Sequence, residues 1–145
     1  MGREVRRVPA SWQHPKERSG EYKPLLAGDY EAEAKEFLDK ANAEGLQAAV
    51  DWYGQAPERE NYMPSWPESE RTHYMMYETC SEGTPISPAF ATPEELARWL
   101  ADTGASAFGG QTASYEGWLR VARGGFAPSA VFSQSTGLVS GVDAL

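Results

Sequence analysis

The chain has 145 residues, 41% of them hydrophobic, with one cysteine and a formal net charge of −8. This length and composition indicate one folded domain and exclude global disorder, a disulfide framework and a zinc site built from several thiolates. No apolar run approaches the ~20 residues that cross a bilayer, and the basic start lacks the apolar core of a secretory signal, so we expect a cytoplasmic protein without membrane contact.

Charge is distributed unevenly along the chain. Residues 1–23 carry six basic side chains against three carboxylates, whereas residues 24–70 carry eleven carboxylates against three basic side chains, a net charge of −8. Because such a segment repels a polyanion, we expect no direct binding of nucleic acid by the acidic body. An acidic segment suits a basic partner, although a carboxylate-rich surface also simply keeps a protein in solution.

Residues 1–28 predict an extended basic N-terminal arm. They contain three prolines and show little periodicity, although Val5, Val8 and Trp12 leave room for a short strand or an anchor on the body. Arginines beside Trp12 are groups that can hold a single nucleic-acid strand. We favour the alternative that the arm pairs with the acidic segment of its own chain.

Residues 29–145 predict a single α+β domain with three to four helices and a small antiparallel sheet. The first helical pattern begins after Asp29, which is a favourable N-cap residue. Gly45 interrupts this pattern and Gly54 ends it, which fits either one helix with a weak point or two shorter helices. Glutamates four residues before lysines predict two ion pairs on its surface, Glu31–Lys35 and Glu36–Lys40.

A loop, a strand and a hairpin are predicted from local composition. Residues 55–70 are rich in proline and lack periodicity, which indicates a loop. Residues 74–79 predict a strand, and their apolar side chains do not alternate, so we expect burial on both faces. Residues 130–133 and 138–142 flank a QSTG turn and predict a hairpin.

Two further helices are predicted over residues 93–103 and 114–123. Thr92 and Glu95 form a capping box for the first helix, and Ser114 caps the second. The apolar stripes of both helices predict one shared core, which contains Leu96, Trp99, Leu100, Trp118 and Leu119.

Few residues show a pattern typical of catalysis. His73 and Cys80 bracket the predicted strand, but a strand of this length would hold them over ~20 Å apart, so we interpret Cys80 as a structural residue. The Gly-rich stretch 104–113 lacks the lysine of a phosphate loop, and no spacing typical of metal ligands occurs, so we expect no catalytic residue, cofactor or metal. The polar segment Glu78–Ser87, with His73, is the remaining candidate for the site of a small enzyme.

The loop over residues 55–70 interleaves aromatic and acidic side chains. Aromatic anchors inside a charged rim are typical of protein–protein interfaces. We therefore predict a partner-binding surface there, although such aromatics can also pin a long loop onto the core. The predicted partner-binding residues are Glu58, Glu60, Tyr62, Trp66, Glu68 and Glu70.

Several segments resemble a family of small phage and prophage accessory proteins. They are MGREVRRVP (Met1–Pro9), YMPSWP (Tyr62–Pro67), MMYETCSEGTPISPAFATPEELARWL (Met75–Leu100) and APSAV (Ala127–Val131). Members begin with a similar basic stretch and carry a similar Y-E-T-x-S-E-G-T-P-x-S-P run, and the likeness covers most of the chain. Some relatives carry a cysteine-rich, zinc-knuckle-like insert that this chain lacks. The family has no settled activity and therefore supplies no catalytic residue.

The resemblance implies a phage-encoded protein in the cytoplasm of a bacterial host, where small accessory proteins often block host defence. With the acidic segment, it leads us to expect a non-enzymatic binding protein that inhibits a nucleic-acid-handling host complex, such as a CRISPR effector. Two alternatives stay open. One is a small enzyme that uses His73 and the Glu78–Ser87 region, and the other is a phage structural or assembly component whose arm exchanges between two copies in a homodimer.

Overall fold

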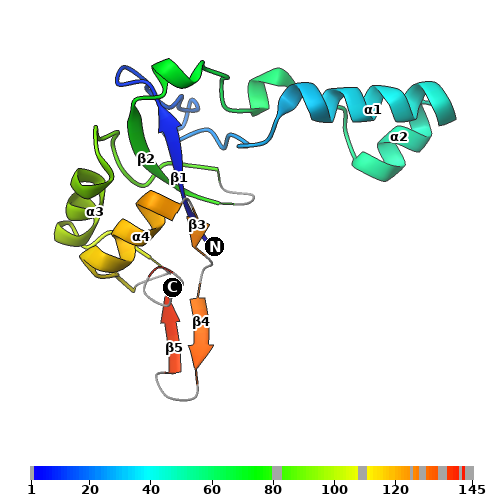
Figure 1. Ribbon diagram of the computed structural model, residues 1–145. Helices are drawn as coiled ribbons and strands as arrows, with labels where there is room; N and C mark the ends of the chain where they lie inside the picture. The colour runs from blue at the N-terminus through cyan, green and yellow to red at the C-terminus, as the bar shows by residue number, and fades with distance from the viewer. Residues whose placement is uncertain are drawn as a thin grey trace. The chain divides into compact units, whose positions relative to one another are not determined.

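The computed structural model describes residues 2–79, 83–107, 111–124, 126–127, 130–133, 137–140 and 142 (Figure 1). The chain divides into two compact units: unit 1 comprises residues 1–23 and 66–145, and unit 2 comprises residues 24–65. Helices and antiparallel strands confirm the α+β class. The division differs from the expected arm followed by one domain, because the residues of the arm belong to the two units.

Unit 1 contains a three-stranded antiparallel sheet. Its strands are β1 (Arg3–Val8), β2 (His73–Glu78) and β3 (Phe126–Ala127), in the order β2-β1-β3. The start of the chain is therefore the central strand of a sheet, where we expected an arm. In β2, the consecutive residues Met75 and Met76 are both buried, which confirms a strand covered on both faces.

The basic side chains of β1 find partners inside unit 1, which explains how so charged a strand occupies the centre of the sheet. Arg3 lies opposite Glu78 in the register, and their charged groups are 3.6 Å apart. Arg6 is paired with Glu4 at 2.9 Å. Both carboxylates lie outside residues 24–70, so these two ion pairs are not the predicted pairing of the arm with the acidic segment.

Two helices, α3 (Pro93–Asp102) and α4 (Tyr115–Gly124), cover one face of this sheet (Figure 1). The Thr92 hydroxyl accepts a hydrogen bond of 3.1 Å from the backbone N–H of Glu95, and the Ser114 hydroxyl accepts one of 3.1 Å from the N–H three residues on. Both predicted N-caps are therefore confirmed.

The core between α3, α4 and the sheet contains the residues that the sequence predicts. Leu96, Leu100 and Trp118 are 0% exposed, and Trp99 and Leu119 pack partly buried against the same cluster. Buried apolar area of this kind is the main stabilising contribution to a small domain.

The predicted hairpin is confirmed as β4 (Ala130–Ser133) paired with β5 (Gly137–Ser140). Cys80 and the Gly109–Gly110 tip lie outside the described residues. The interpretation of Cys80 as structural and the expectation that the Gly-rich stretch is no phosphate loop therefore stay predictions.

Unit 2 contains a hairpin of two helices, α1 (Tyr30–Glu44) and α2 (Leu46–Tyr53). The Asp29 carboxylate accepts a hydrogen bond of 3.2 Å from the N–H three residues on, which confirms it as N-cap. Gly45 lies between the helices with a φ of +98°, a conformation that residues with a side chain rarely adopt. The chain therefore forms two helices rather than one.

The ion pairs on α1 differ from the predicted ones. Lys35 pairs with Asp39 at 2.7 Å and Lys40 with Glu44 at 2.6 Å, so each lysine pairs toward the C-terminal end of the helix. Each lysine has a carboxylate four residues away on both sides, and exposed pairs of this kind differ little in stability. Spacing alone therefore does not decide which pair forms.

The remaining helical segments are short. Two 3-10 turns lie in the stretch predicted as a loop, at Arg59–Asn61 in unit 2 and at Glu68–Glu70 in unit 1. Among the helices of the described ranges, none combines the length and apolar character that crossing a bilayer requires.

Candidate interaction surface

The six residues predicted to meet a partner belong to both units. Glu58, Glu60 and Tyr62 lie in unit 2, and Trp66, Glu68 and Glu70 lie in unit 1. All four carboxylates are exposed, and Glu68 pairs with the neighbouring Arg71. The carboxylates can therefore be reached by a partner, whereas the two aromatic residues have more enclosed surroundings.

Tyr62 is a buried residue of unit 2. Its side chain is 7% exposed, and its ring packs edge-on against Tyr30 with 5.5 Å between the ring centroids. Burial and the adjacent Glu33 carboxylate, which accepts a hydrogen bond from the Tyr62 hydroxyl, raise the pKa of Tyr62. The alternative that such an aromatic pins the loop onto the core therefore describes Tyr62, which is not available as an exposed anchor.

Trp66 is half-buried in unit 1. Its ring packs edge-on against Trp12 with 5.0 Å between the ring centroids. The Trp12 indole in turn donates a 3.1 Å hydrogen bond to the Tyr77 hydroxyl. Part of the Trp66 ring therefore stabilises unit 1, and the remainder is open to a partner.

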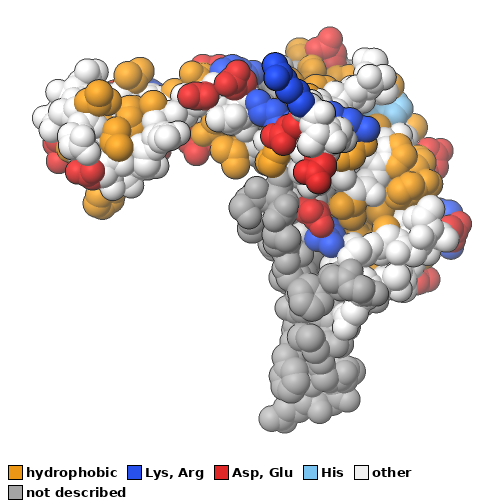
Figure 2. Space-filling model, turned by 180° about the vertical axis from the view of Figure 1, so that it is seen from behind, with side chains coloured by type: hydrophobic (Ala, Val, Ile, Leu, Met, Phe, Trp, Pro, Cys, Tyr) orange, Lys and Arg blue, Asp and Glu red, His pale blue; other side chains and the backbone are white. Residues whose placement is uncertain are grey.

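Exposed hydrophobic side chains gather in unit 2, and Figure 2 shows part of this surface with acidic side chains among them. The most exposed of them are Trp52 at 73% and Leu46 at 65%. Among the described residues, Tyr22 is the one large exposed hydrophobic residue of unit 1. Those of unit 2 are Leu26, Leu38, Leu46, Val50, Trp52 and Tyr53. A concentration of this kind is typical of a docking surface.

Helix α2 carries an apolar stripe that α1 covers only in part. Leu46, Val50 and Tyr53 recur at helical spacing and so share one face. On that face Ala49 is fully buried, and the ring of Tyr53 lies 6.3 Å from that of Phe37 in α1. The stripe itself nevertheless stays 36–65% exposed. Much of this apolar surface is therefore free to meet another molecule.

A pocket of about 340 Å³ shares Tyr53 with this stripe. Its lining includes the buried rings of Phe37 and Tyr62. Glu36 and Glu58 are exposed at its edge, and within the described residues neither carboxylate has an ion-pair partner. Unit 2 as a whole has nine carboxylates against three basic side chains, a net charge of −6. The pocket can therefore receive a basic side chain with an apolar stem.

Among the described residues of the alternative enzyme site, His73 and Glu78 do not converge. His73 and Glu78 are the two ends of β2, and their odd spacing directs the side chains to opposite faces. Glu78 is engaged by Arg3 at 3.6 Å and by the Thr84 hydroxyl at 3.4 Å, while Nδ1 of His73 lies 2.8 Å from the Thr72 hydroxyl. In the described part of the chain, no three His, Cys, Asp or Glu side chains are grouped so as to hold a metal ion.

No family model matches the chain, and no curated protein or solved structure matches it either. The resemblance to phage accessory proteins therefore stays a proposal, and the surface of unit 2 carries the functional argument. Sequence reasoning did not select Trp52 for this surface. The sequence does contain an indication of its exposure. Trp52 lies off the stripe of Leu46, Val50 and Tyr53, and a large aromatic residue outside the packed face of a helix is exposed.

Proposed function

We propose that the protein is a non-enzymatic binding protein whose unit 2 holds a basic protein partner. The observation that carries the proposal is the coincidence of exposed apolar side chains and a net charge of −6 in one unit. Apolar side chains such as Trp52 and Leu46 would supply contact area that is removed from water on binding. The carboxylates would select a basic partner and speed its association.

The partner that this chemistry fits best is a host protein surface that normally holds nucleic acid. Such surfaces carry lysines and arginines for phosphates and aromatic platforms for bases. Unit 2 offers carboxylates in place of phosphates, and exposed apolar groups in place of bases. Its binding would exclude nucleic acid, and its effect would therefore be inhibition of the partner.

The biological setting of the proposal comes from the resemblance of the chain to phage accessory proteins. In that setting the protein is phage-encoded, acts in the cytoplasm of a bacterial host and inhibits a defence complex such as a CRISPR effector. The assembly alternative requires an arm that is free to exchange, but β1 pairs with β2 and β3 of its own chain. An anti-defence binder therefore has more support than an assembly component.

The proposal is tested by competition with nucleic acid. The full chain, carrying an affinity tag, captures proteins from a nuclease-treated bacterial lysate, and the captured protein is purified. The complex is then challenged with single-stranded DNA, duplex DNA and RNA. We expect one of them to displace the chain, and the chain to inhibit the activity of its partner. A stable complex that holds both the chain and nucleic acid would contradict the proposal.

Two variants of α2 separate a specific surface from a general effect of charge. Leu46→Ser combined with Val50→Ser removes apolar area and leaves the charge unchanged, so we expect the affinity to fall by about tenfold or more. Gln47→Ser changes an exposed residue off the apolar stripe and serves as the matched control. If both variants fold and bind as tightly as the unmodified chain, the interface does not include α2.

A further inference from the structure

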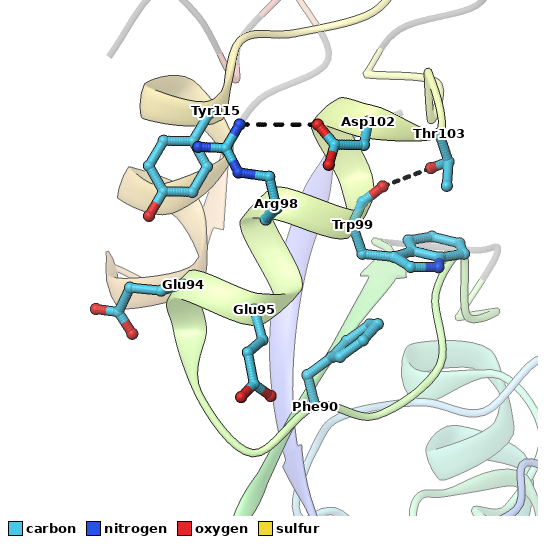
Figure 3. Close-up of a pocket in the computed structure, with 8 residues that line it drawn as sticks. All are labelled: Phe90, Glu94, Glu95, Arg98, Trp99, Asp102, Thr103 and Tyr115. Carbon is cyan, nitrogen blue, oxygen red and sulfur yellow. Dashed lines mark hydrogen bonds and ion pairs between the residues drawn. The ribbon is translucent and has the colours of Figure 1, made fainter.

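Unit 1 has a surface groove of about 590 Å³ along α3, with a mostly apolar lining (Figure 3). Phe90 and Trp99 lie on one side of it, with their ring centroids 6.0 Å apart and their planes inclined by 45°. Phe90 is held in place by two backbone hydrogen bonds to Tyr74 of β2. Tyr115, at the start of α4, lies on the other side. The groove thus has aromatic rings on both sides.

Three of the four charged side chains along the groove are already neutralised. The Arg98 guanidinium lies 3.7 Å from the Asp102 carboxylate and 4.1 Å from the ring centroid of Tyr115. The Glu94 carboxylate lies 2.6 Å from the guanidinium of Arg123 in α4. This hydrogen bond lowers the pKa of Glu94. None of these groups therefore requires a ligand to balance its charge.

Glu95 is the exception, because its carboxylate has no ion-pair partner among the described residues. It precedes Trp99 by one helical turn and so shares its face of α3. In Figure 3 its side chain extends toward the side of the groove that holds Phe90. The Glu95 carboxylate and the rings of Phe90 and Trp99 line the same groove. Such a combination stabilises an organic cation, and a planar guanidinium also stacks on aromatic rings.

The openness of the groove indicates which kind of molecule would carry this cation. A small ligand binds well where a pocket encloses most of its surface, whereas this groove is open to solvent. A peptide compensates for an open groove, because its backbone and neighbouring side chains cover the bound group from the other side. We propose that the groove binds an arginine-bearing peptide segment of a partner protein, with the guanidinium against Phe90 and Trp99 and paired with Glu95. The groove lies entirely in unit 1, so this proposal does not depend on the proposed role of unit 2.

The test follows the indole N–H signal of Trp99 by NMR in the full chain during titration with a defined peptide. The probe is the N-acetylated, C-amidated pentapeptide Gly-Leu-Arg-Leu-Gly. The internal reference is the indole signal of Trp12 in unit 1, whose N–H donates to the Tyr77 hydroxyl and whose ring does not line the groove. We expect the Trp99 signal to shift with a dissociation constant on the order of 1 mM. The same peptide with glutamine in place of arginine should bind about tenfold more weakly.

Two glutamate variants test the charge pairing. Glu95→Gln keeps the shape of the side chain and removes its charge. We therefore expect it to lower the affinity for the arginine peptide about tenfold and to leave the affinity for the glutamine peptide unchanged. Glu94→Gln is the matched control, because Glu94 is the adjacent residue and already pairs with Arg123. We expect this control to bind the arginine peptide within about twofold of the unmodified chain.

Four results would overturn the proposal. They are equal binding of the arginine and glutamine peptides, equal weakening by the two glutamate variants, and no shift of the Trp99 signal at about 10 mM peptide. The fourth is binding of N-acetylarginine amide as tightly as the pentapeptide, since the ligand would then be a small cation and not a peptide segment. Phe90→Leu keeps apolar volume but removes the aromatic face. It should therefore lower the affinity for the arginine peptide more than the affinity for the glutamine peptide.

Discussion

The hydroxyl of Tyr77 lies 2.9 Å from Nδ1 of His14, and both side chains are buried. Nε2 of His14 lies 2.6 Å from the carbonyl oxygen of Lys23. Because a carbonyl only accepts hydrogen bonds, Nε2 carries the proton, and Nδ1 of the neutral ring accepts from the Tyr77 hydroxyl. That hydroxyl accepts in turn from the indole N–H of Trp12 at 3.1 Å. Neutral His14 therefore satisfies every donor and acceptor in this network.

The stability of unit 1 should depend on the protonation of His14. Burial lowers the pKa of His14 below its ordinary value of 6.5, and the charge of Arg6 lowers it further against the opposing effect of the Lys23 carbonyl. The unfolded chain therefore takes up this proton at a higher pH than the folded chain does. The contribution of neutral His14 to the unfolding free energy is fully present above pH 6.5. It decreases as the pH falls from there toward the lowered pKa. Urea unfolding between about pH 8 and about pH 5 measures this loss.

Histidine variants assign this pH dependence to one residue. His14→Gln should be less stable than the unmodified chain at about pH 8 and should lose less stability on acidification. His73→Gln makes the same change at the half-exposed second histidine, outside this hydrogen-bond network, and is the control. If the unfolding free energies of the His14 variant and of the unmodified chain change in parallel with pH, another group is responsible for the pH dependence.

Trp118 should contribute more to stability than any exposed tryptophan. It is 0% exposed between α3, α4 and the sheet, so Trp118→Ala leaves a cavity and should cost about 3–5 kcal/mol of unfolding free energy. Trp52→Ala makes the same change at a side chain that is 73% exposed and should cost under about 1 kcal/mol. Both values come from denaturant titration. Equal costs for the two variants would contradict the core placement of Trp118.

The parts of the fold that the sequence predicts are those decided by neighbouring residues. The N-caps at Asp29, Thr92 and Ser114 are local hydrogen bonds, and each is present as predicted. The apolar stripes of α3 and α4 are also local patterns, and they identify the buried Leu96 and Trp118. Helices, their starts and their packed faces could therefore be predicted.

What sequence reasoning missed depends on residues that are distant in the chain. The charges of β1 are compatible with a central strand only because Glu78, more than seventy positions away from Arg3, lies opposite it. In the sequence, Tyr62 resembles an exposed anchor, but in the structure Glu33 and Tyr30 enclose it. No pattern within a short window contains these partners, so the sheet order and the true exposed surface could not be derived from the sequence.

Gly45 should be required for the turn between α1 and α2. Its φ is +98°, and no atom lies within 4 Å of a Cβ built on it, so strain and not a clash opposes a side chain. Gly45→Ala should therefore destabilise unit 2 by about 1–3 kcal/mol. Gly124→Ala, at the helical end of α4 with equally open space and no positive φ, is the control and should be neutral or stabilising. Thermal unfolding followed by circular dichroism compares the two, and equal effects would contradict the strain argument.

Charge reversal in unit 2 should slow the association of the proposed complex. Glu36→Lys combined with Glu58→Lys changes the charge at the edge of the pocket, where neither carboxylate has an ion-pair partner among the residues that the structure describes. Because long-range attraction acts before contact, the association rate should fall by about tenfold and depend less on salt. Glu68→Lys with Glu70→Lys makes the same change in unit 1 and is the control. If the two pairs slow association equally, unit 2 has no special role in attracting the partner.

Trp52 should hold the proposed complex together once it has formed. Its ring is 73% exposed, so Trp52→Ala should leave the fold intact but speed dissociation by about tenfold or more, as loss of an interface anchor worth about 1.4 kcal/mol requires. Trp66→Ala removes a ring that packs on Trp12, so it should lower the melting temperature and leave the dissociation rate of folded molecules unchanged. Binding kinetics and melting curves of both variants decide between them. If Trp66→Ala speeds dissociation and Trp52→Ala does not, the interface is in the 66–70 segment of unit 1 and not on α2.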